Sequence, residues 1–77
     1  MTVKSLNQLQ VGEKGTIVKV GGAGAAKRRI LDMGVVRGTE IEMLRVAPLG
    51  DPVELRVKGY NLSLRKAEAQ TIDVEVG

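Results

Sequence analysis

The chain lacks cysteine, histidine, phenylalanine and tryptophan, and it has one tyrosine and two prolines among 77 residues. Without cysteine there is no disulfide, no thiol chemistry and no thiolate metal site. Without histidine, the usual general base and imidazole metal ligands are also absent. The aromatic surface on which single-stranded nucleic acid stacks is missing too. These absences argue against an enzyme and against a nucleic-acid-binding domain.

Long apolar runs are also missing. No stretch approaches the ~20 apolar residues that a membrane span needs, and residues 1–5 show no hydrophobic region of a signal peptide. The net charge is +3, from 12 basic and 9 acidic residues, which is typical of a solvated surface of mixed sign. The length suits one domain, residues 1–77. We expect a cytoplasmic domain with no direct membrane insertion, in keeping with the absence of cysteine.

Alternating and β-branched segments predict five strands. Residues 16–20 are rich in β-branched side chains, and residues 71–76 alternate between apolar and polar side chains. Residues 39–46 form a third strand in which the apolar parity changes after Met43. That change predicts a β-bulge near Met43.

Residues 53–64 predict a β-hairpin with a two-residue loop at Lys58 and Gly59, and this hairpin supplies the remaining two strands. This register sorts the side chains by polarity, and a slip of one residue would destroy the sorting. Favoured two-residue turns need a positive φ, so Lys58 costs about 1–2 kcal/mol there. The apolar pairs are Val57 with Tyr60, Leu55 with Leu62 and Val53 with Leu64, and the polar pairs are Arg56 with Asn61 and Glu54 with Ser63.

One helix is expected at residues 25–33, with its apolar face formed by Ala26, Ile30 and Met33. Gly34 suits the left-handed position that ends many helices. Short helical turns are expected at residues 5–9, where Ser5 and Gln8 fit a capping box, and at residues 65–70. The expected fold is mainly β. It is a small five-stranded barrel, closed to remove its edges, with one short α-helix inserted after the first strand.

With these segments placed, the whole chain resembles the ferrous iron transport protein A (FeoA) family, whose members are small cytoplasmic barrels of SH3-like fold. The matching stretches run in family order and cover nearly all of the chain. They are residues 6–9 (LNQL), 12–17 (GEKGTI), 29–34 (RILDMG), 38–41 (GTEI), 47–52 (APLGDP) and 57–60 (VKGY).

This resemblance implies a non-enzymatic cytoplasmic accessory protein of ferrous iron uptake. The expected partner is the cytoplasmic region of a membrane ferrous iron transporter that carries a GTPase domain, and a homo-oligomer is a further possibility. Similar domains occur at the C-terminus of metal-dependent repressors. Family descriptions also attach transition-metal binding to the domain.

The candidate partner-binding residues come from the basic helix and from the proline-bracketed loop. Leu31 beside basic residues could anchor a partner, although Met33 and Gly34 on the same helix also fit a core and a cap. Leu49 at the loop tip could pack over an end of the barrel, or insert into a partner or a second copy. The candidates are Arg28, Arg29, Leu31, Asp32, Arg37, Pro48, Leu49 and Tyr60.

No metal ligand set and no cofactor site is expected. The carboxylates are the only ligand candidates, and carboxylate-only sites suit harder ions than ferrous iron. The glycines at 21, 22 and 24 lack the spacing and the Lys-Ser/Thr pair of a phosphate-binding loop. The carboxylates in question are Glu40, Glu42, Glu54, Asp73 and Glu75.

The alternative function is a small nucleic-acid-binding barrel of the translation-associated kind. Residues 12–17 would fit such a domain too. The missing aromatics and the modest charge count against it, and a nucleic-acid complex would weaken steeply with salt.

Overall fold

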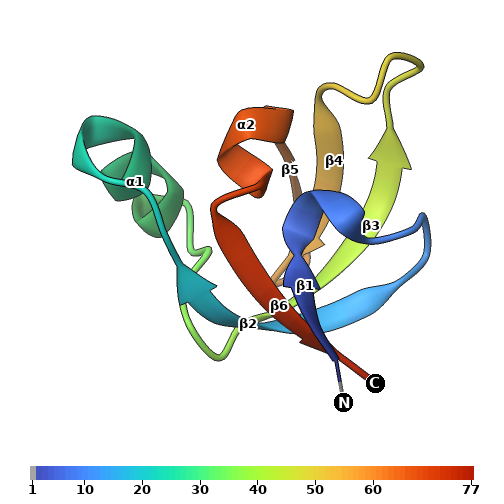
Figure 1. Ribbon diagram of the computed structural model, residues 1–77, viewed down its shortest axis with the longest axis horizontal. Helices are drawn as coiled ribbons and strands as arrows, with labels where there is room; N and C mark the ends of the chain where they lie inside the picture. The colour runs from blue at the N-terminus through green and yellow to red at the C-terminus, as the bar shows by residue number, and fades with distance from the viewer. Residues whose placement is uncertain (1) are drawn as a thin grey trace.

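The computed structural model describes residues 2–77, which form six strands, two short α-helices and one 3-10 turn (Figure 1). All strand pairs in the single sheet are antiparallel. In chain order the elements are β1 (Thr2–Ser5), η1 (Leu6–Gln8), β2 (Lys14–Val20), α1 (Gly24–Asp32), β3 (Glu40–Val46), β4 (Val53–Val57), β5 (Tyr60–Leu64), α2 (Lys66–Ala69) and β6 (Ile72–Val76).

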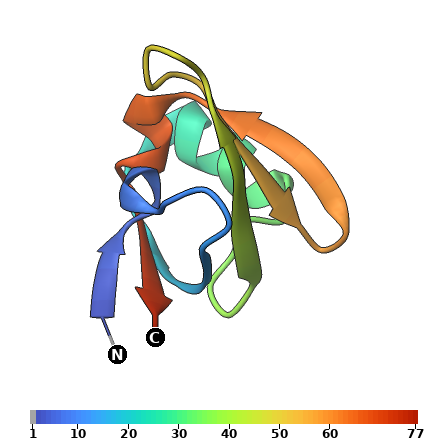
Figure 2. The same ribbon diagram turned by 90° about the vertical axis from the view of Figure 1, so that its right-hand side faces the viewer.

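The mainly β class is confirmed, but the sheet has six strands and not five. Its order is β1-β6-β2-β3-β4-β5, so α1 follows the second strand of the chain and not the first. The expected closure is also wrong, because within residues 2–77 the edge strands β1 and β5 do not pair with each other. The sheet therefore curls on itself and keeps two free edges (Figures 1 and 2).

The β4–β5 hairpin has the register that the sequence predicted. Val57 pairs with Tyr60, Leu55 with Leu62 and Val53 with Leu64. Lys58 takes the expected positive φ, 51°. The bulge is also confirmed, because the β3–β4 register shifts between Met43 and Arg45. Alternation of side chains thus fixed both features, since only these registers put the apolar side chains on one face.

The core lies inside the curled sheet and draws on nearly every element. Leu55 and Met43 are both 0% exposed at its centre. From α1, Ile30 is buried and Met33 is packed at the margin, but Ala26 is exposed. The expected apolar helix face is therefore shorter by one turn, because the first turn of α1 extends beyond the sheet that the helix covers.

Both helix boundaries that the sequence marked are found. Gly34 has φ +90° directly after α1, and its N–H donates to the Leu31 carbonyl at 3.0 Å. Glycine adopts this left-handed backbone without the strain that a Cβ brings. At the start of η1 the Ser5 N–H donates to Gln8 Oε1 at 3.0 Å, which is half of the predicted capping box.

Candidate partner-binding site

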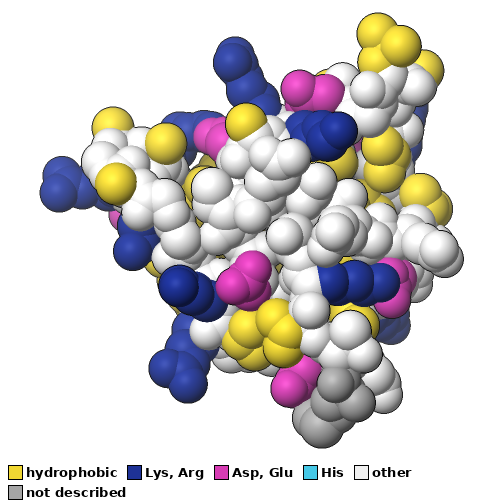
Figure 3. Space-filling view, viewed as in Figure 1, with side chains coloured by type: hydrophobic (Ala, Val, Ile, Leu, Met, Phe, Trp, Pro, Cys, Tyr) yellow, Lys and Arg dark blue, Asp and Glu magenta, His cyan; other side chains and the backbone are white. Residues whose placement is uncertain are grey.

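Helix α1 presents most of its side chains to solvent. Arg28 and Asp32 are exposed, and Leu31 is 36% exposed. The Arg29 guanidinium forms an ion pair with Glu68, which lies on α2 far along the chain. Several Lys and Arg side chains lie around α1, at the left of Figure 3. The exposed side of α1 is thus mainly basic and carries one large apolar residue, Leu31.

Tyr60, on the β4–β5 hairpin, lies beside the C-terminal end of this helix. A Cβ built on Gly34 would lie 3.0 Å from the Tyr60 hydroxyl oxygen, so the two segments touch. Tyr60 is 43% exposed. The structure therefore brings Tyr60 and the end of α1 together, although the two are far apart in the sequence. We call Arg28, Arg29, Leu31, Asp32 and Tyr60 the helix patch.

A shallow cleft of about 210 Å³ separates α1 from α2. Glu68 at its wall forms the ion pair with Arg29, which links the two helices across the cleft. Small side chains predominate in the rest of the lining, which leaves the cleft largely apolar. It is lined by Gly21, Gly22, Ala23, Ala26, Lys27, Ile30, Ala67, Glu68 and Thr71.

The loop between β3 and β4 carries the most exposed large apolar side chain of the described residues. Leu49 is 96% exposed, which excludes the alternative that it packs over the end of the barrel. Pro48 beside it is exposed as well. Hydrophobic atoms mark the tip of this loop at the upper right of Figure 3. We call Pro48 and Leu49 the loop tip.

Three hydrogen bonds hold this loop in place. The Gly50 N–H donates to the Ala47 carbonyl at 2.7 Å, and the Ala47 N–H donates to the Pro52 carbonyl at 3.1 Å. Asp51 Oδ1 accepts the backbone N–H of Lys66 at 3.0 Å, at the first residue of α2. The loop tip is therefore exposed but held in place. Binding of a partner would then cost little conformational entropy in this loop.

Helix α2 connects the two candidate surfaces. It contacts α1 through Glu68 and the β3–β4 loop through the Lys66 N–H. Sequence reasoning missed both Asp51 and Glu68 as positioning residues. The signal for Glu68 was present locally, because it is the third residue of α2 and its Oε1 accepts the Arg65 N–H at 3.0 Å, the arrangement of a capping box.

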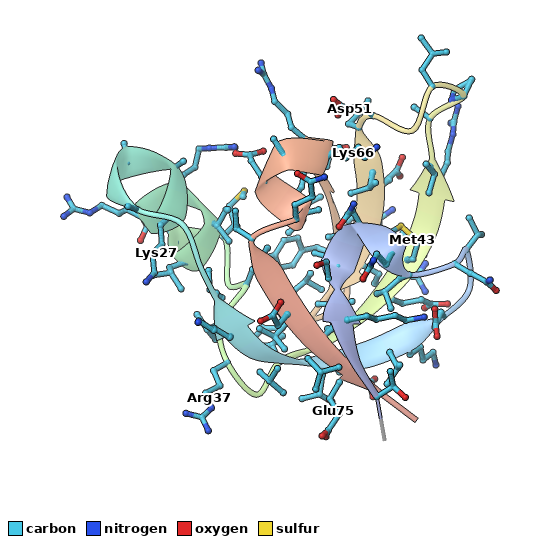
Figure 4. The ribbon with its side chains drawn as sticks, viewed as in Figure 1. Lys27, Arg37, Met43, Asp51, Lys66 and Glu75 are labelled. Carbon is cyan, nitrogen blue, oxygen red and sulfur yellow. The ribbon has the colours of Figure 1, made fainter. Side chains whose placement is uncertain are left out.

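Arg37 does not join either surface. It lies in the turn before β3, where the next residue, Gly38, donates its N–H to the Ile17 carbonyl at 2.7 Å. In Figure 4 the Arg37 side chain points away from the molecule at the end opposite to Asp51 and Lys66. The eight predicted residues thus divide into the helix patch, the loop tip and one isolated arginine.

The carboxylates are distributed along the sheet and do not converge. Within residues 2–77 no group of three or more His, Cys, Asp or Glu side chains is placed to hold a metal ion. Glu42 pairs across the sheet with Lys14 and Arg56, and its carboxylate lies 3.9 Å from the Arg56 guanidinium. Glu54 and Asp73 likewise pair with basic residues of neighbouring strands, and cross-strand pairs of opposite charge stabilise strand pairing modestly.

One carboxyl group has a shifted pKa. The pKa of Glu13 lies below its ordinary value, chiefly because the Gln10 backbone N–H donates to it at 3.0 Å. The Lys4 ammonium at 3.0 Å acts in the same direction. Both contacts favour the ionised carboxylate. These contacts link the loop before β2 to β1, and we assign them a role in the fold and not in binding.

No helix among the described residues is long and apolar enough to cross a membrane.

Comparison with known proteins supports the family resemblance and the fold. The family model of the FeoA domain matches residues 4–76. A Porphyromonas gingivalis protein named as an Fe(2+) transport protein A/Fe(2+) transporter FeoB fusion protein is 45% identical over 71 residues. The match covers 92% of this chain, and the chain spans only 8% of the length of that curated relative.

Two solved structures of similar proteins have the same fold. An FeoA-like protein from Clostridium acetobutylicum is 47% identical, with a TM-score of 0.88, and the match covers 99% of this chain and 90% of that one. FeoA from Stenotrophomonas maltophilia, described as a prokaryotic SH3 domain protein and determined with zinc, is 27% identical, with a TM-score of 0.81. That match covers 92% of this chain and 88% of the other.

Proposed function

The chain belongs to the FeoA domain family, which is linked to ferrous iron transport, and on that premise we propose that it is a non-enzymatic cytoplasmic accessory protein of ferrous iron uptake. It binds the cytoplasmic region of a membrane ferrous iron transporter that carries a GTPase domain. The observation that carries this proposal is the P. gingivalis fusion protein, in which a similar segment is part of the same polypeptide as FeoB. A covalent link of this kind holds two partners at high effective concentration.

The helix patch and the loop tip supply the contact surfaces in this proposal. The loop tip offers an anchored apolar side chain, and the helix patch adds Leu31 among charged residues. A few buried apolar anchors surrounded by polar contacts supply most of the binding energy at many protein interfaces. Because α2 contacts both segments, the two surfaces meet the transporter as one rigid unit.

The protein acts on transport only if it binds two conformations of the transporter with unequal affinity. Ferrous iron is the cargo of the transporter in this account and not a ligand of this chain. The chain has no histidine or cysteine with which to bind iron tightly or to act as a nucleophile. The effect of the protein is therefore a shift in a conformational equilibrium.

Biolayer interferometry with the immobilised protein tests the proposal. The analytes are the soluble GTPase-carrying domain and the full transporter in lipid nanodiscs. We expect saturable binding to at least one of them, and weaker binding for both Leu49→Asp and Leu31→Asp. Val11→Asp is the matched control, because Val11 is 64% exposed in a different loop. A filter-binding assay across a salt series tests the alternative of nucleic-acid binding, which should weaken steeply with salt.

Absence of binding to both forms of the transporter would contradict the proposed function. Equal binding by all three variants would preserve the partner but reject the helix patch and the loop tip as the contact surfaces.

A further inference from the structure

Strand β5 is an edge of the sheet, and its outward backbone groups can be identified from the register. In a two-residue hairpin the pair that closes the loop, Val57 with Tyr60, is hydrogen-bonded. Pairs alternate between bonded and non-bonded along an antiparallel ladder. The N–H and C=O groups of Asn61 and Ser63 therefore point away from β4.

These outward groups face solvent. Asn61 and Ser63 are both exposed, and β4 is the only strand that pairs with β5 within residues 2–77. In Figure 2 the β4–β5 hairpin reaches out at one side of the molecule, with β5 along its outer margin. An edge of this kind is a template for pairing with another extended chain.

The charged residues that flank β5 along the chain are all positive, and the nearby carboxylates of Glu68 and Asp51 accept the backbone N–H groups of Arg65 and Lys66, not their side chains. Lys58 precedes β5, and Arg65 and Lys66 follow it; all three are exposed. None of them takes part in an ion pair among the described residues. Exposed cations at an edge disfavour pairing with another cationic strand and favour an acidic one.

Self-pairing of β5 is disfavoured for the same reason. If Asn61 of one copy lay opposite Ser63 of a second copy, Lys58 would approach Arg65 and Lys66 of that second copy. Like charges at such positions destabilise strand pairing. In this register a second copy is therefore a poorer occupant of the edge than a chain with acidic side chains.

The inward side of the edge is apolar. Tyr60 and Leu62 point to the core side of β5 but keep exposed surface, and the end of α1 lies beside Tyr60. A strand added next to β5 would place every second side chain against this apolar surface.

We propose that the free edge of β5 binds an extended segment of another protein, with alternating apolar and acidic side chains, as an additional antiparallel strand. The backbone of Asn61 and Ser63 supplies the hydrogen bonds, while Lys58, Arg65 and Lys66 select for acidic side chains. This binding mode goes beyond the proposed function, because it does not require an iron transporter.

The probe is a capped synthetic peptide of about seven residues, matched to a typical strand length, with alternating valine and glutamate. Its counterpart has lysine in place of glutamate. NMR hydrogen exchange on the ¹⁵N-labelled protein reports each amide. With saturating acidic peptide we expect exchange of the Asn61 and Ser63 amides to slow by about tenfold or more, as formation of a hydrogen bond predicts. The lysine peptide should have no such effect.

Two variants test the backbone and the charge terms separately. Ser63→Pro removes an outward N–H, which an edge strand tolerates, and should weaken peptide binding by about tenfold in Kd; Ser63→Ala retains the N–H and should bind normally. The double variant Lys58→Asn with Arg65→Gln should lose the preference for the acidic peptide.

Unprotected Asn61 and Ser63 amides at saturating peptide would overturn the proposal, as would equal binding of the two peptides by the unmodified protein. If these amides become protected without peptide as the protein concentration rises, the edge binds a second copy of this chain. That result would also overturn the proposal.

Discussion

The β3–β4 loop and the β4–β5 hairpin that follows it differ in how far their leucines are buried. At one end of β4 the β3–β4 loop projects from the sheet, and Leu49 at its tip is 96% exposed. At the other end a two-residue turn closes the β4–β5 hairpin, and Leu55 between the two ends is 0% exposed. Two leucines only a few residues apart thus have opposite environments.

This difference separates stability from recognition. The hairpin side chains are placed by register, so their burial contributes to folding. The β3–β4 loop is placed by its own hydrogen bonds and by the contact of Asp51 with α2, so its tip contributes little to folding. Substitutions between Leu49 and Leu55 should therefore change the free energy of unfolding by very different amounts, from almost nothing in the loop to several kcal/mol in the hairpin.

The largest effect is expected for Leu55→Ala. Removing a fully buried leucine should lower the free energy of unfolding by roughly 2–5 kcal/mol, which in a domain this small threatens folding itself. Urea denaturation followed by circular dichroism measures the change. A loss under about 1 kcal/mol would be typical of a surface residue, and it would mean that burial of the hairpin side chains contributes little to stability.

A smaller effect is expected for Asp51→Ala, which removes the acceptor for the Lys66 N–H at the start of α2. Loss of a comparable helix cap costs about 1 kcal/mol, which lowers Tm by about 4–8 °C in a domain of this size. Asp51→Asn keeps an acceptor oxygen and is the matched control. If both variants have the same Tm as the original protein, the loop is not anchored through α2.

Leu49→Asp should leave the free energy of unfolding within about 0.5 kcal/mol of the original value, because the side chain is exposed. Association is expected to respond instead, since burying a charge at an apolar contact is costly. Denaturation and transporter binding should be measured on the same preparation. Unfolding of this variant would place Leu49 in the core and would erase the contrast with Leu55.

The smallest effect concerns a third loop, which carries the exposed Val11 and is held by Glu13. The pKa of Glu13 is lowered in the folded protein, first by the Gln10 N–H and then by Lys4. A lowered folded pKa gives stability that is present above the unfolded pKa and is lost as pH falls through the folded pKa.

The measurement is an NMR titration of the Glu13 carboxyl carbon. Lys4→Met should raise the Glu13 pKa partway, because the Gln10 N–H remains, and Glu13→Gln should remove this share of the acid sensitivity of folding. An unchanged Glu13 pKa in Lys4→Met would show that Lys4 does not contribute to holding this loop.

Local patterns predicted a large part of this fold. The hairpin register followed from side chains that sort by polarity on both faces, and the end of α1 followed from Gly34. The bulge after Met43 followed from a change of parity. Each of these features depends on residues close in sequence, so the amino-acid pattern contains the information. The helix and the loop were expected as two sources of candidate residues, but the sequence did not indicate that Tyr60 lies beside the end of α1 or that Arg37 lies apart from both.

The sequence by itself determined the core face of the hairpin, the helix boundaries and a composition without imidazole or thiol. Only the tertiary structure decided that Thr2–Ser5 is a strand, because β1 exists through pairing with β6 at the other end of the chain. It also decided that Leu49 is exposed, and that Arg29 and Glu68 meet. These features arise from contacts between segments distant in sequence, and no local periodicity records which distant segment will be the neighbour.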